Sequence, residues 1–453
     1  MIKPSIPKGT RDFGPDVVRK RNYILNTIRG IFETYGFQPL ETPAMENRST
    51  LTGKYGEEGD KLMFRILNNG DIYPKAAAAT DTPSLAAAVS EKALRYDLTI
   101  PFARYMVLHR NDITLPFKRY QIQPVWRADR PQKGRYREFL QCDADIVGSA
   151  SLLNEMELLA LYDTVLHRLG LEGYALLVNN RKLLTGLAEL IGKPDQLTAI
   201  TTAIDKLDKI GIAGVTAELE SRGLPAEDIR TINRYLEVSG NNTDKLQQLH
   251  ELLGGSAIAR EGLAELETVL RSAYHSFHEA PVLSPTLARG LNYYTGTILE
   301  VKAPPAVRMG SLGGGGRYDN LTGLFGMDGV PAVGISFGVD RIYDVLEELQ
   351  LFPPATEQST ELLFLQLIPE SLPVVFSLLQ QLRAGGHAAE LYPDAVKLDK
   401  QMKYANKRQI PFVVILGESE WQAGTLSVKN MATGEQKEIA RDALLGYVEA
   451  STR

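Results

Sequence analysis

The chain has 453 residues, of which 44% are hydrophobic, and a formal net charge of −5, so it can form two or three domains with ample cores. No apolar run is long enough to cross a membrane, and the N-terminus lacks the apolar core of a signal peptide. A single cysteine, Cys142, excludes an internal disulfide framework and a cysteine-based zinc site, so we expect a cytoplasmic protein. The small net charge leaves nucleic-acid binding open, because a local basic patch is sufficient for it.

The N-terminal region predicts a helix followed by a short strand. After Asp16, which suits a helix start, apolar side chains recur at helical spacing at Ile24, Ile28, Ile31, Phe32 and Tyr35, which predicts a helix over 15–35. Residues 36–46 then predict a loop and a strand interrupted by prolines. Such a strand belongs at a sheet edge or an interface.

The next hundred residues predict further short elements. Residues 61–71 predict a strand and a glycine turn, and the alanine-rich stretch 76–88 predicts a loop and a helix. Residues 94–105 predict a strand that ends at Pro101. In that strand Asp97 and Thr99 would share one face, and Leu98 and Ile100 the other.

The stretch 126–146 is the most informative part of the chain. A loop with four arginines and a lysine leads into a strand whose apolar face would be formed by Leu140, Cys142, Ala144 and Ile146. The opposite face would carry an aromatic ring, an amide and two carboxylates, from Phe139, Gln141, Asp143 and Asp145. Arginine is a planar, bidentate donor that suits polyphosphate. The pattern therefore indicates a nucleotide triphosphate held beside an amine-bearing substrate, and the alternative is a charged hairpin exposed to water.

The remainder of the chain predicts a helical segment, a return to strands, and a separate small domain. Residues 181–280 form amphipathic helices between glycine and proline breaks, and His275 and His278 there lack the further ligands that a metal site needs. Strands are predicted over 288–301 and 331–338, followed by a helix from Val339 and a linker over 351–356. Residues 361–453 alternate strand and helix, which predicts an α/β domain. The run of glycines at 313–316 fits neither GxxxxGK[ST] nor GxGxxG, so we expect these glycines to let backbone pass close to a ligand.

Several motifs resemble those of class II aminoacyl-tRNA synthetases. The long first helix with the following strand at Pro43 resembles motif 1, the arginine-rich loop and strand resemble motif 2, and Arg341, in the first turn of the helix from Val339, resembles the motif 3 arginine. ArgProGlnLysGlyArgTyrArgGluPhe with GlnCysAspAlaAsp, ArgGlyLeuAsnTyrTyr (289–294) and GlyGlyArgTyrAsp (315–319) are similar to the histidyl-tRNA synthetase family in particular. The second of these motifs has Asn292 where many members have aspartate, so Asn292 is left out of the catalytic set.

The resemblance implies a fold class and a domain order. It implies an α+β catalytic domain, built on the mixed, mainly antiparallel sheet of class II synthetases, with a helical insertion and a C-terminal α/β anticodon-binding domain. The expected ranges are 1–180 (catalytic, first part), 181–280 (insertion), 281–350 (catalytic, second part), 351–360 (linker) and 361–453 (anticodon-binding). In the last range Lys397, Lys400, Tyr404 and Lys407 would share one helical face, which fits RNA contact or a solvated surface.

The resemblance also implies a reaction and its residues. The reaction is ATP-dependent activation of L-histidine and transfer to tRNA(His), with Mg²⁺ on the phosphates and a homodimeric enzyme. The implied catalytic residues are Arg289 and Arg127. ATP would be bound by Arg127, Asp129, Arg135, Phe139 and Arg341. Histidine would be bound by Asp97, Thr99, Gln141, Asp145, Arg289, Tyr293, Tyr294 and Tyr318.

Two alternatives stay open at this point. Non-catalytic paralogues of the family serve as regulatory subunits of an ATP phosphoribosyltransferase, but they typically lack the last domain and have degraded histidine motifs. A related synthetase for proline, threonine or glycine is the other alternative, and the pair Asp145 and Tyr294 argues against it.

Overall fold

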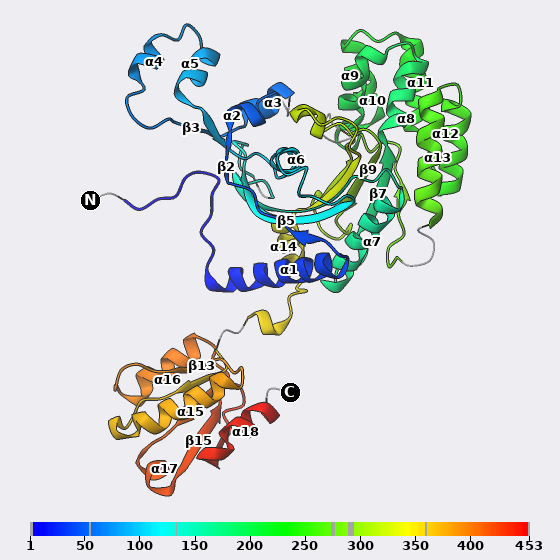
Figure 1. Cartoon of the computed structure of the whole chain (residues 1–453). Helices are drawn as coiled ribbons and strands as arrows, with labels where there is room; N and C mark the ends of the chain where they lie inside the picture. Colours follow the sequence, from blue (N-terminus) through cyan, green and yellow to red (C-terminus); the bar gives the residue numbers. More distant parts are fainter. Residues whose placement is uncertain are drawn as a thin grey trace. The chain divides into compact units, whose positions relative to one another are not determined.

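The computed structural model describes residues 3–53, 56–132, 134–272, 277–288, 294–357 and 360–451. The chain divides into two compact units. The first comprises Met1–Phe13 and Arg21–Leu351, and the second comprises Gly14–Lys20 and Phe352–Arg453. Figure 1 shows the elements of both. Among the helices of the described ranges, none combines the length and apolarity that a membrane span requires.

An eight-stranded sheet organises the first unit, in the order β1-β5-β6-β11-β10-β9-β7-β8. The internal pairs from β5 to β7 are antiparallel, and β1 and β8 pair in parallel at the two edges. Its strands are β1 (Gln38–Pro39), β5 (Phe117–Trp126), β6 (Glu138–Val147), β7 (Ala175–Asn180), β8 (Val282–Leu283), β9 (Thr297–Lys302), β10 (Ser311–Arg317) and β11 (Ala332–Phe337). The predicted edge position of a proline-bearing strand is confirmed by β1, which contains Pro39, but the strand expected at Pro43 is wrong, because Pro43 lies in the segment between β1 and β2.

Three helices cover one face of this sheet, namely α1 (Pro15–Thr34), α7 (Leu153–Arg168) and α14 (Val339–Glu348) (Figure 1). The apolar stripe of α1 is buried, and Phe32 meets Phe337 of β11 with ring centroids 5.9 Å apart. Tyr162 of α7 meets the same phenylalanine at 4.7 Å. The predicted first helix is confirmed to within one residue, because its apolar spacing matches the surface that it covers.

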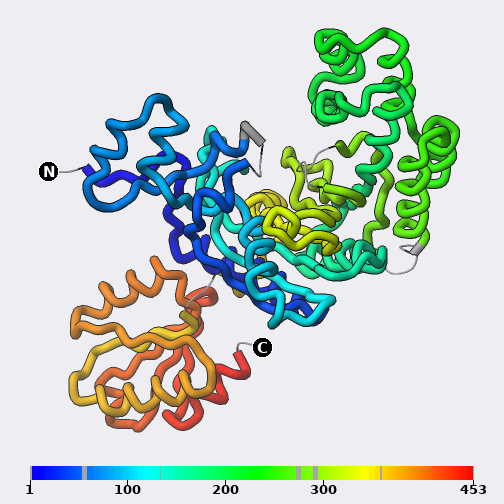
Figure 2. The backbone as a smooth tube through the Cα atoms, turned by 45° about the horizontal axis from the view of Figure 1, so that its top comes forward, coloured from blue at the N-terminus to red at the C-terminus, as the bar shows by residue number. Residues whose placement is uncertain are grey.

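A small three-stranded sheet with short helices follows the first strand. Its order is β2-β4-β3, and its elements are β2 (Met45–Asn47), α2 (Arg48–Leu51), α3 (Gly56–Lys61), β3 (Arg65–Ile66), α4 (Tyr73–Ala77), α5 (Thr82–Val89) and β4 (Lys92–Leu94). Figure 2 shows α4 and α5, in blue, as a lobe beside the sheet. The predicted loop and helix over 76–88 correspond to α4 and α5, and the predicted strand over 61–71 is limited to β3.

The strand predicted over 94–105 is wrong. Only β4 reaches into this range, and α6 (Thr99–Leu108) occupies most of it. Pro101 is the third residue of the helix, where a missing N–H leaves no helical hydrogen bond unmade. An oxygen of Asp97 accepts from the main-chain N–H of Ile100 at 3.2 Å and helps to start the helix. Ile100, Ala103 and Met106 are buried at helical spacing.

Six α-helices form the described part of the predicted helical segment, residues 181–272, and gather beside β7 (Figure 1, green). They are α8 (Arg181–Leu190), α9 (Leu197–Ile204), α10 (Leu207–Ser221), α11 (Ala226–Leu236), α12 (Asn242–Leu253) and α13 (Ala257–Ser272). Helix α8 packs on α13, and a methyl group at Gly186 would lie 2.5 Å from the side chain of Ala259. The helical character of the predicted segment is confirmed over 181–272, residues 277–280 are not helical, and the ends of the insertion stay a prediction.

The second unit contains a five-stranded sheet in the order β13-β12-β14-β15-β16. Strands β13, β12 and β14 are parallel, and β15 and β16 continue antiparallel. Both faces of the parallel part carry buried clusters, one around Leu362 and Val414 and one around Leu363 and Val413. The elements are β12 (Leu362–Phe364), α15 (Leu372–Ala384), β13 (Ala389–Leu391), α16 (Leu398–Lys407), β14 (Phe412–Ile415), α17 (Glu418–Ala423), β15 (Thr425–Asn430), β16 (Gln436–Ala440) and α18 (Leu444–Ser451).

Candidate active site

The face of the large sheet opposite α1 carries polar side chains in matched rows. Strand register places Arg119 of β5, Asp145 of β6, Gly334 of β11 and Gly316 of β10 in one row. The neighbouring row is Gln121, Asp143, Ser336 and Gly314. On β6 the alternate residues Cys142, Ala144 and Ile146 are buried on the other face. The predicted two-faced strand is confirmed.

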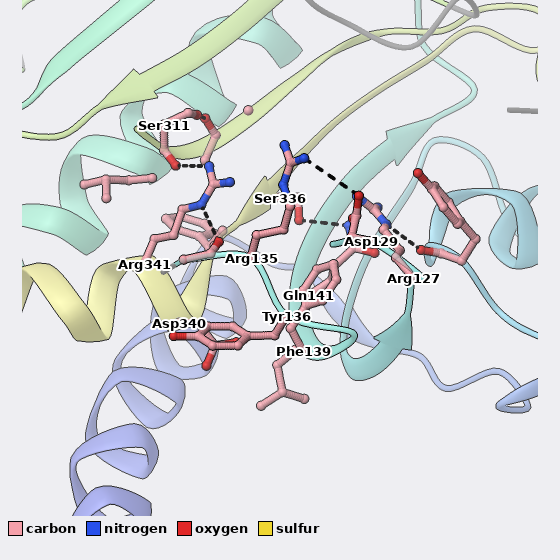
Figure 3. Close-up of a pocket in the computed structure, with 18 of the residues that line it drawn as sticks. Arg127, Asp129, Arg135, Tyr136, Phe139, Gln141, Ser311, Ser336, Asp340 and Arg341 are labelled. Carbon is pink, nitrogen blue, oxygen red and sulfur yellow. Dashed lines mark hydrogen bonds and ion pairs between the residues drawn. The ribbon is translucent and has the colours of Figure 1, made fainter. Parts of the chain in front are cut away.

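A cavity of about 520 Å³ opens above this face (Figure 3). All five residues predicted to bind ATP line it, namely Arg127, Asp129, Arg135, Phe139 and Arg341. They come from the end of β5, the loop between β5 and β6, strand β6 and the first turn of α14. Three permanently charged guanidinium groups around one cavity provide a site for a polyanion.

Arg127 stands at the inner end of this cavity. Its Nε donates to the carbonyl oxygen of Tyr96 at 3.0 Å, and its guanidinium lies 4.3 Å from the centre of the Tyr96 ring. The ring of Phe139 lies on another side, with its centre 5.2 Å away. These contacts restrict the orientation of Arg127, so that it needs little reordering to meet a phosphate.

Arg341 and Arg135 line other parts of the same cavity. Arg341 donates to the carbonyl oxygens of Ser311 at 2.8 Å and Gly134 at 3.2 Å. Arg135 is half exposed and pairs with Asp129 at 3.7 Å. The carboxylate of Asp340, next to Arg341 in sequence, pairs instead with Arg11 and Arg21.

A smaller pocket of about 70 Å³ adjoins the large cavity. The two share Arg127, Gln141, Gly314 and Ser336 as lining residues. The small pocket is lined by six of the residues predicted to bind histidine, namely Asp97, Thr99, Gln141, Asp145, Tyr294 and Tyr318. The two others, Arg289 and Tyr293, lie outside the described residues.

Asp145 is the most constrained residue of the small pocket. Its carboxylate pairs with Arg119 at 2.8 Å and accepts a hydrogen bond from the hydroxyl of Tyr318. Burial raises the pKa of Asp145, and Arg119 and the Tyr318 hydrogen bond oppose that rise. The Arg119 side chain is fully buried, so Asp145 is the carboxylate that balances its charge at this position.

Glycine is required at Gly334, which lines the small pocket, and at Gly316 in the neighbouring strand β10. A methyl group at Gly334 would lie 1.9 Å from Oδ1 of Asp145, so a side chain there would displace the carboxylate. At Gly316 a methyl group would lie 3.1 Å from the ring of Tyr294. Gly314 lines both cavities, and the close approach of its backbone to a ligand stays a prediction.

Some pocket residues are absent from the predicted set. Arg119, Tyr96, Ser336 and Asp143 all contact or line the site. Strand alternation placed Asp143 on the polar face with Gln141 and Asp145, but the family resemblance assigned no role to it. Arg119 comes from another strand, and only the register of β5 against β6 places it opposite Asp145. His278, considered above for a metal, pairs with Asp163, and His275 lies outside the described residues.

Comparison with known proteins identifies the family of the chain. Residues 88–342, more than half of the 453, match the family described as "Histidyl-tRNA synthetase". The chain belongs to the histidyl-tRNA synthetase family. Residues 365–451 match the "Anticodon binding domain". The expected fold class is confirmed, with an α+β catalytic domain on a mixed, mainly antiparallel sheet, a helical region, and a C-terminal anticodon-binding domain.

Individual members of the family are similar over the entire chain. A histidine–tRNA ligase of Phocaeicola vulgatus is 54% identical over 453 residues, with 99% of each chain covered. A histidine–tRNA ligase of Christiangramia forsetii is 53% identical over 457 residues, again with 99% of each covered. The crystal structure of a histidyl-tRNA synthetase from a Nostoc species superposes with a TM-score of 0.84 at 32% identity and covers 100% of both chains.

Proposed function

We propose that this chain is a histidine–tRNA ligase, an aminoacyl-tRNA synthetase that activates L-histidine with ATP and transfers it to tRNA(His). The observation that carries the proposal is the pair of adjoining cavities, one with three arginines and the other with a paired carboxylate and two tyrosines. The relatives that are 54% and 53% identical over nearly the whole chain support the same conclusion.

The first step needs no protein nucleophile, because the histidine carboxylate is already ionised. That carboxylate attacks the α-phosphorus of ATP and expels pyrophosphate, so that the protein contributes positioning and charge stabilisation. Arg127 lies where the two cavities meet, and we assign it to the α-phosphate together with Arg289. Arg135 and Arg341 are assigned to the outer phosphates, and the ring of Phe139 to adenine.

Magnesium is proposed as part of the incoming MgATP. The carboxylates that line the large cavity are Asp129 and Asp340, and each is already paired with arginine. Within the described ranges no three His, Cys, Asp or Glu side chains are grouped as a metal site. These residues fit a metal that takes most of its ligands from phosphate and water, as Mg²⁺ does.

The small pocket is assigned to histidine. Asp145, oriented by Arg119 and Tyr318, would accept an imidazole N–H. Burial, and next the Asp145 and Asp143 carboxylates, raise the pKa of Tyr294, so that its hydroxyl stays a hydrogen-bond donor. Asp97, Thr99 and Gln141 are assigned to the α-amino end, and Tyr293 to the same substrate. Polar side chains that hydrogen-bond the imidazole should reject apolar amino acids, because an apolar side chain would leave these polar groups without a partner.

A homodimer is proposed as the active assembly. The support is the resemblance of the first helix and the following segment around Pro43 to motif 1, which forms the dimer interface in class II synthetases. Light scattering of the purified protein, coupled to size-exclusion chromatography, would give the mass of a dimer if this is right and of a single 50.0 kDa chain if it is wrong.

The proposed reaction is tested by ATP–pyrophosphate exchange, with each amino acid offered singly and without tRNA. Exchange with histidine alone is expected. Exchange with proline, threonine or glycine would assign the chain to another amino acid. Absence of exchange with every amino acid would contradict the proposal and favour the regulatory paralogue.

A further inference from the structure

Asp143 occupies the centre of the polar face and has no role in the assignments above. It is 3% exposed, lies between Gln141 and Asp145 on β6, and lines the small pocket. Its cross-strand neighbours are Gln121 of β5 and Ser336 of β11. A buried aspartate is costly unless it is paired, so its presence here needs an explanation.

Asp143 differs from Asp145 in how its oxygens are used. Asp145 meets Arg119 at 2.8 Å and accepts from Tyr318. Oδ1 of Asp143 and Oδ2 of Asp145 are both buried and accept no hydrogen bond from any residue that the structure describes, but only the Asp145 oxygen has a cation, Arg119, within ion-pair distance. A buried carboxylate oxygen that lines a pocket without a donor is an acceptor available to a ligand.

The charges around Asp143 favour a cationic ligand group. Burial raises the pKa of Asp143 to about 7; Arg119 and Ser336 oppose the rise, and Asp145 and Asp97 add to it. Since Arg119 already pairs with Asp145, the described neighbours provide no second buried cation beside Asp143. The charged and polar groups that neighbour it on the sheet or line the same pocket are Arg119, Gln121, Asp145, Ser336, Asp97, Tyr294, Tyr318 and Arg127, of which Arg127 lies at the junction with the large cavity.

The order of residues along β6 indicates which part of the substrate meets Asp143. Gln141 lies at the junction with the large cavity, and Asp145 lies two steps further along the strand. Alternate residues of a strand are about 6.6 Å apart, so each step is comparable with the length of an amino acid side chain. A histidine with its carboxylate at the junction and its imidazole at Asp145 has its α-ammonium group between them, beside Asp143.

We propose that Asp143 is a further substrate-binding residue, which accepts an N–H of the α-ammonium group of histidine from the side of the sheet. This inference rests on the proposed function and deepens it. Asp97, which lies just before α6, contacts the same ammonium group from the side opposite to β6. The α-ammonium group is then held between two carboxylates, and Asp145 remains dedicated to the imidazole.

The test compares two ligands that differ in the group Asp143 is inferred to bind. Histidinol has the α-ammonium and imidazole groups without the carboxylate, and 3-(imidazol-4-yl)propionate has the carboxylate and imidazole without the amine. Calorimetry would measure both against the full-length wild type and Asp143→Asn, which has nearly the same shape. We expect histidinol to bind Asp143→Asn about 10-fold or more weakly, as for the loss of a hydrogen bond to a charged group. The propionate should bind equally or more tightly.

A matched control and a second readout keep the test decisive. Cys142→Ala alters the adjacent residue on the opposite face of β6, and it should weaken neither ligand selectively. Histidine binding to the wild type at pH 7 should release about half a proton, seen as a dependence of the binding heat on buffer ionisation enthalpy, and Asp143→Asn should abolish most of it.

The outcomes separate this inference from the proposed function. If the wild type fails to exchange ATP with histidine, the function itself is wrong. If the wild type is active but Asp143→Asn binds histidinol normally, or loses both ligands to the same extent, the role of Asp143 is wrong. Proton release that is unchanged in Asp143→Asn would also overturn it.

Discussion

Two buried aspartates on one strand illustrate how position decides the chemistry of a residue. Asp143 and Asp145 are two residues apart on the same face of β6, and both are 3% exposed. Asp145 lies opposite Arg119, so its charge is balanced inside the protein. Asp143 lies opposite the neutral Gln121, so its charge is left for a ligand to balance.

The pair of Asp145 and Arg119 leads to a prediction about stability. Asp145→Asn should destabilise the protein by about 3 kcal/mol, because it leaves the fully buried Arg119 charged and unpaired. Urea unfolding would measure this loss, and exchange assays would show weaker use of histidine. Replacing Arg119 by Met in the same variant should restore much of the stability but not the use of histidine. If Asp145→Asn unfolds like the wild type, the ion pair contributes less than its burial implies.

The pKa of Asp143 leads to a prediction about pH. Its folded pKa of about 7 is above the unfolded value of about 3.9, so ionisation favours unfolding. The resulting loss of folding stability is absent below the unfolded pKa, grows as pH rises, and levels off above the folded pKa. Without ligand, the Asp143→Asn variant should therefore become increasingly more stable than the wild type as pH rises from about 4 to about 7. Urea midpoints across this range would measure the gain, and equal midpoints at pH 8 would contradict it.

At the scale of elements, the N-terminal segment joins two parts of the large cavity. The main-chain N–H of Arg137, in the loop between β5 and β6, donates to the carbonyl oxygen of Gly9 at 2.9 Å. Arg11 pairs with Asp340 of α14 at 2.6 Å and lies 3.2 Å from the ring centre of Tyr136. Tyr136 and Asp340 both line the large cavity (Figure 3). The segment therefore connects the loop that carries Arg135 with the helix that carries Arg341.

Arg11→Ala should consequently weaken the use of ATP more than the use of histidine. We expect the KM for ATP in exchange to rise about tenfold, because a part-buried charged hydrogen bond contributes about 1.5 kcal/mol. The KM for histidine should stay near its wild-type value. Lys8→Ala is the control, since Lys8 is exposed and its main-chain carbonyl is retained. Equal increases in both KM values would indicate a general loss of structure instead.

At the scale of the whole molecule, we assign histidine activation to the two cavities and part of the tRNA binding to the second unit. Every residue named above that lines either cavity belongs to the first unit. The second unit presents exposed lysines on α16, whereas Tyr404 of the predicted lysine face is held by Glu390 and Arg408. Its contribution to RNA binding is therefore expected from the charged surface and not from that ring.

Removal of residues 361–453 should leave histidine activation intact and impair the charging of tRNA. Exchange with histidine should persist, whereas charging of tRNA at limiting concentration should fall about 100-fold, as expected when one of two linked binding surfaces is lost. Both assays on the same preparation, with circular dichroism to verify folding, would measure the difference. A folded, truncated protein that loses exchange as well would show that activation needs the second unit.

The local pattern of apolar and polar residues was sufficient to predict many elements of this protein. The helix α1, the two faces of β6, the helical segment and the α/β unit follow from spacing along the chain, because each is set by which side chains must be buried. Motif resemblance added the ATP and histidine residues, most of which line the two cavities. Pattern failed over 94–105, where a proline was interpreted as the end of a strand although it stands in the first turn of α6.

The sequence by itself determined the family, the order of elements and the identity of most residues that line the site. Only the tertiary structure decided which residues face one another across strands. Arg119 opposite Asp145, Gln121 opposite Asp143, and Gly334 against the Asp145 carboxylate depend on register between segments far apart in the chain. Register is set by the packing of the whole sheet, and with it the assignment of one aspartate to an internal partner and the other to the substrate.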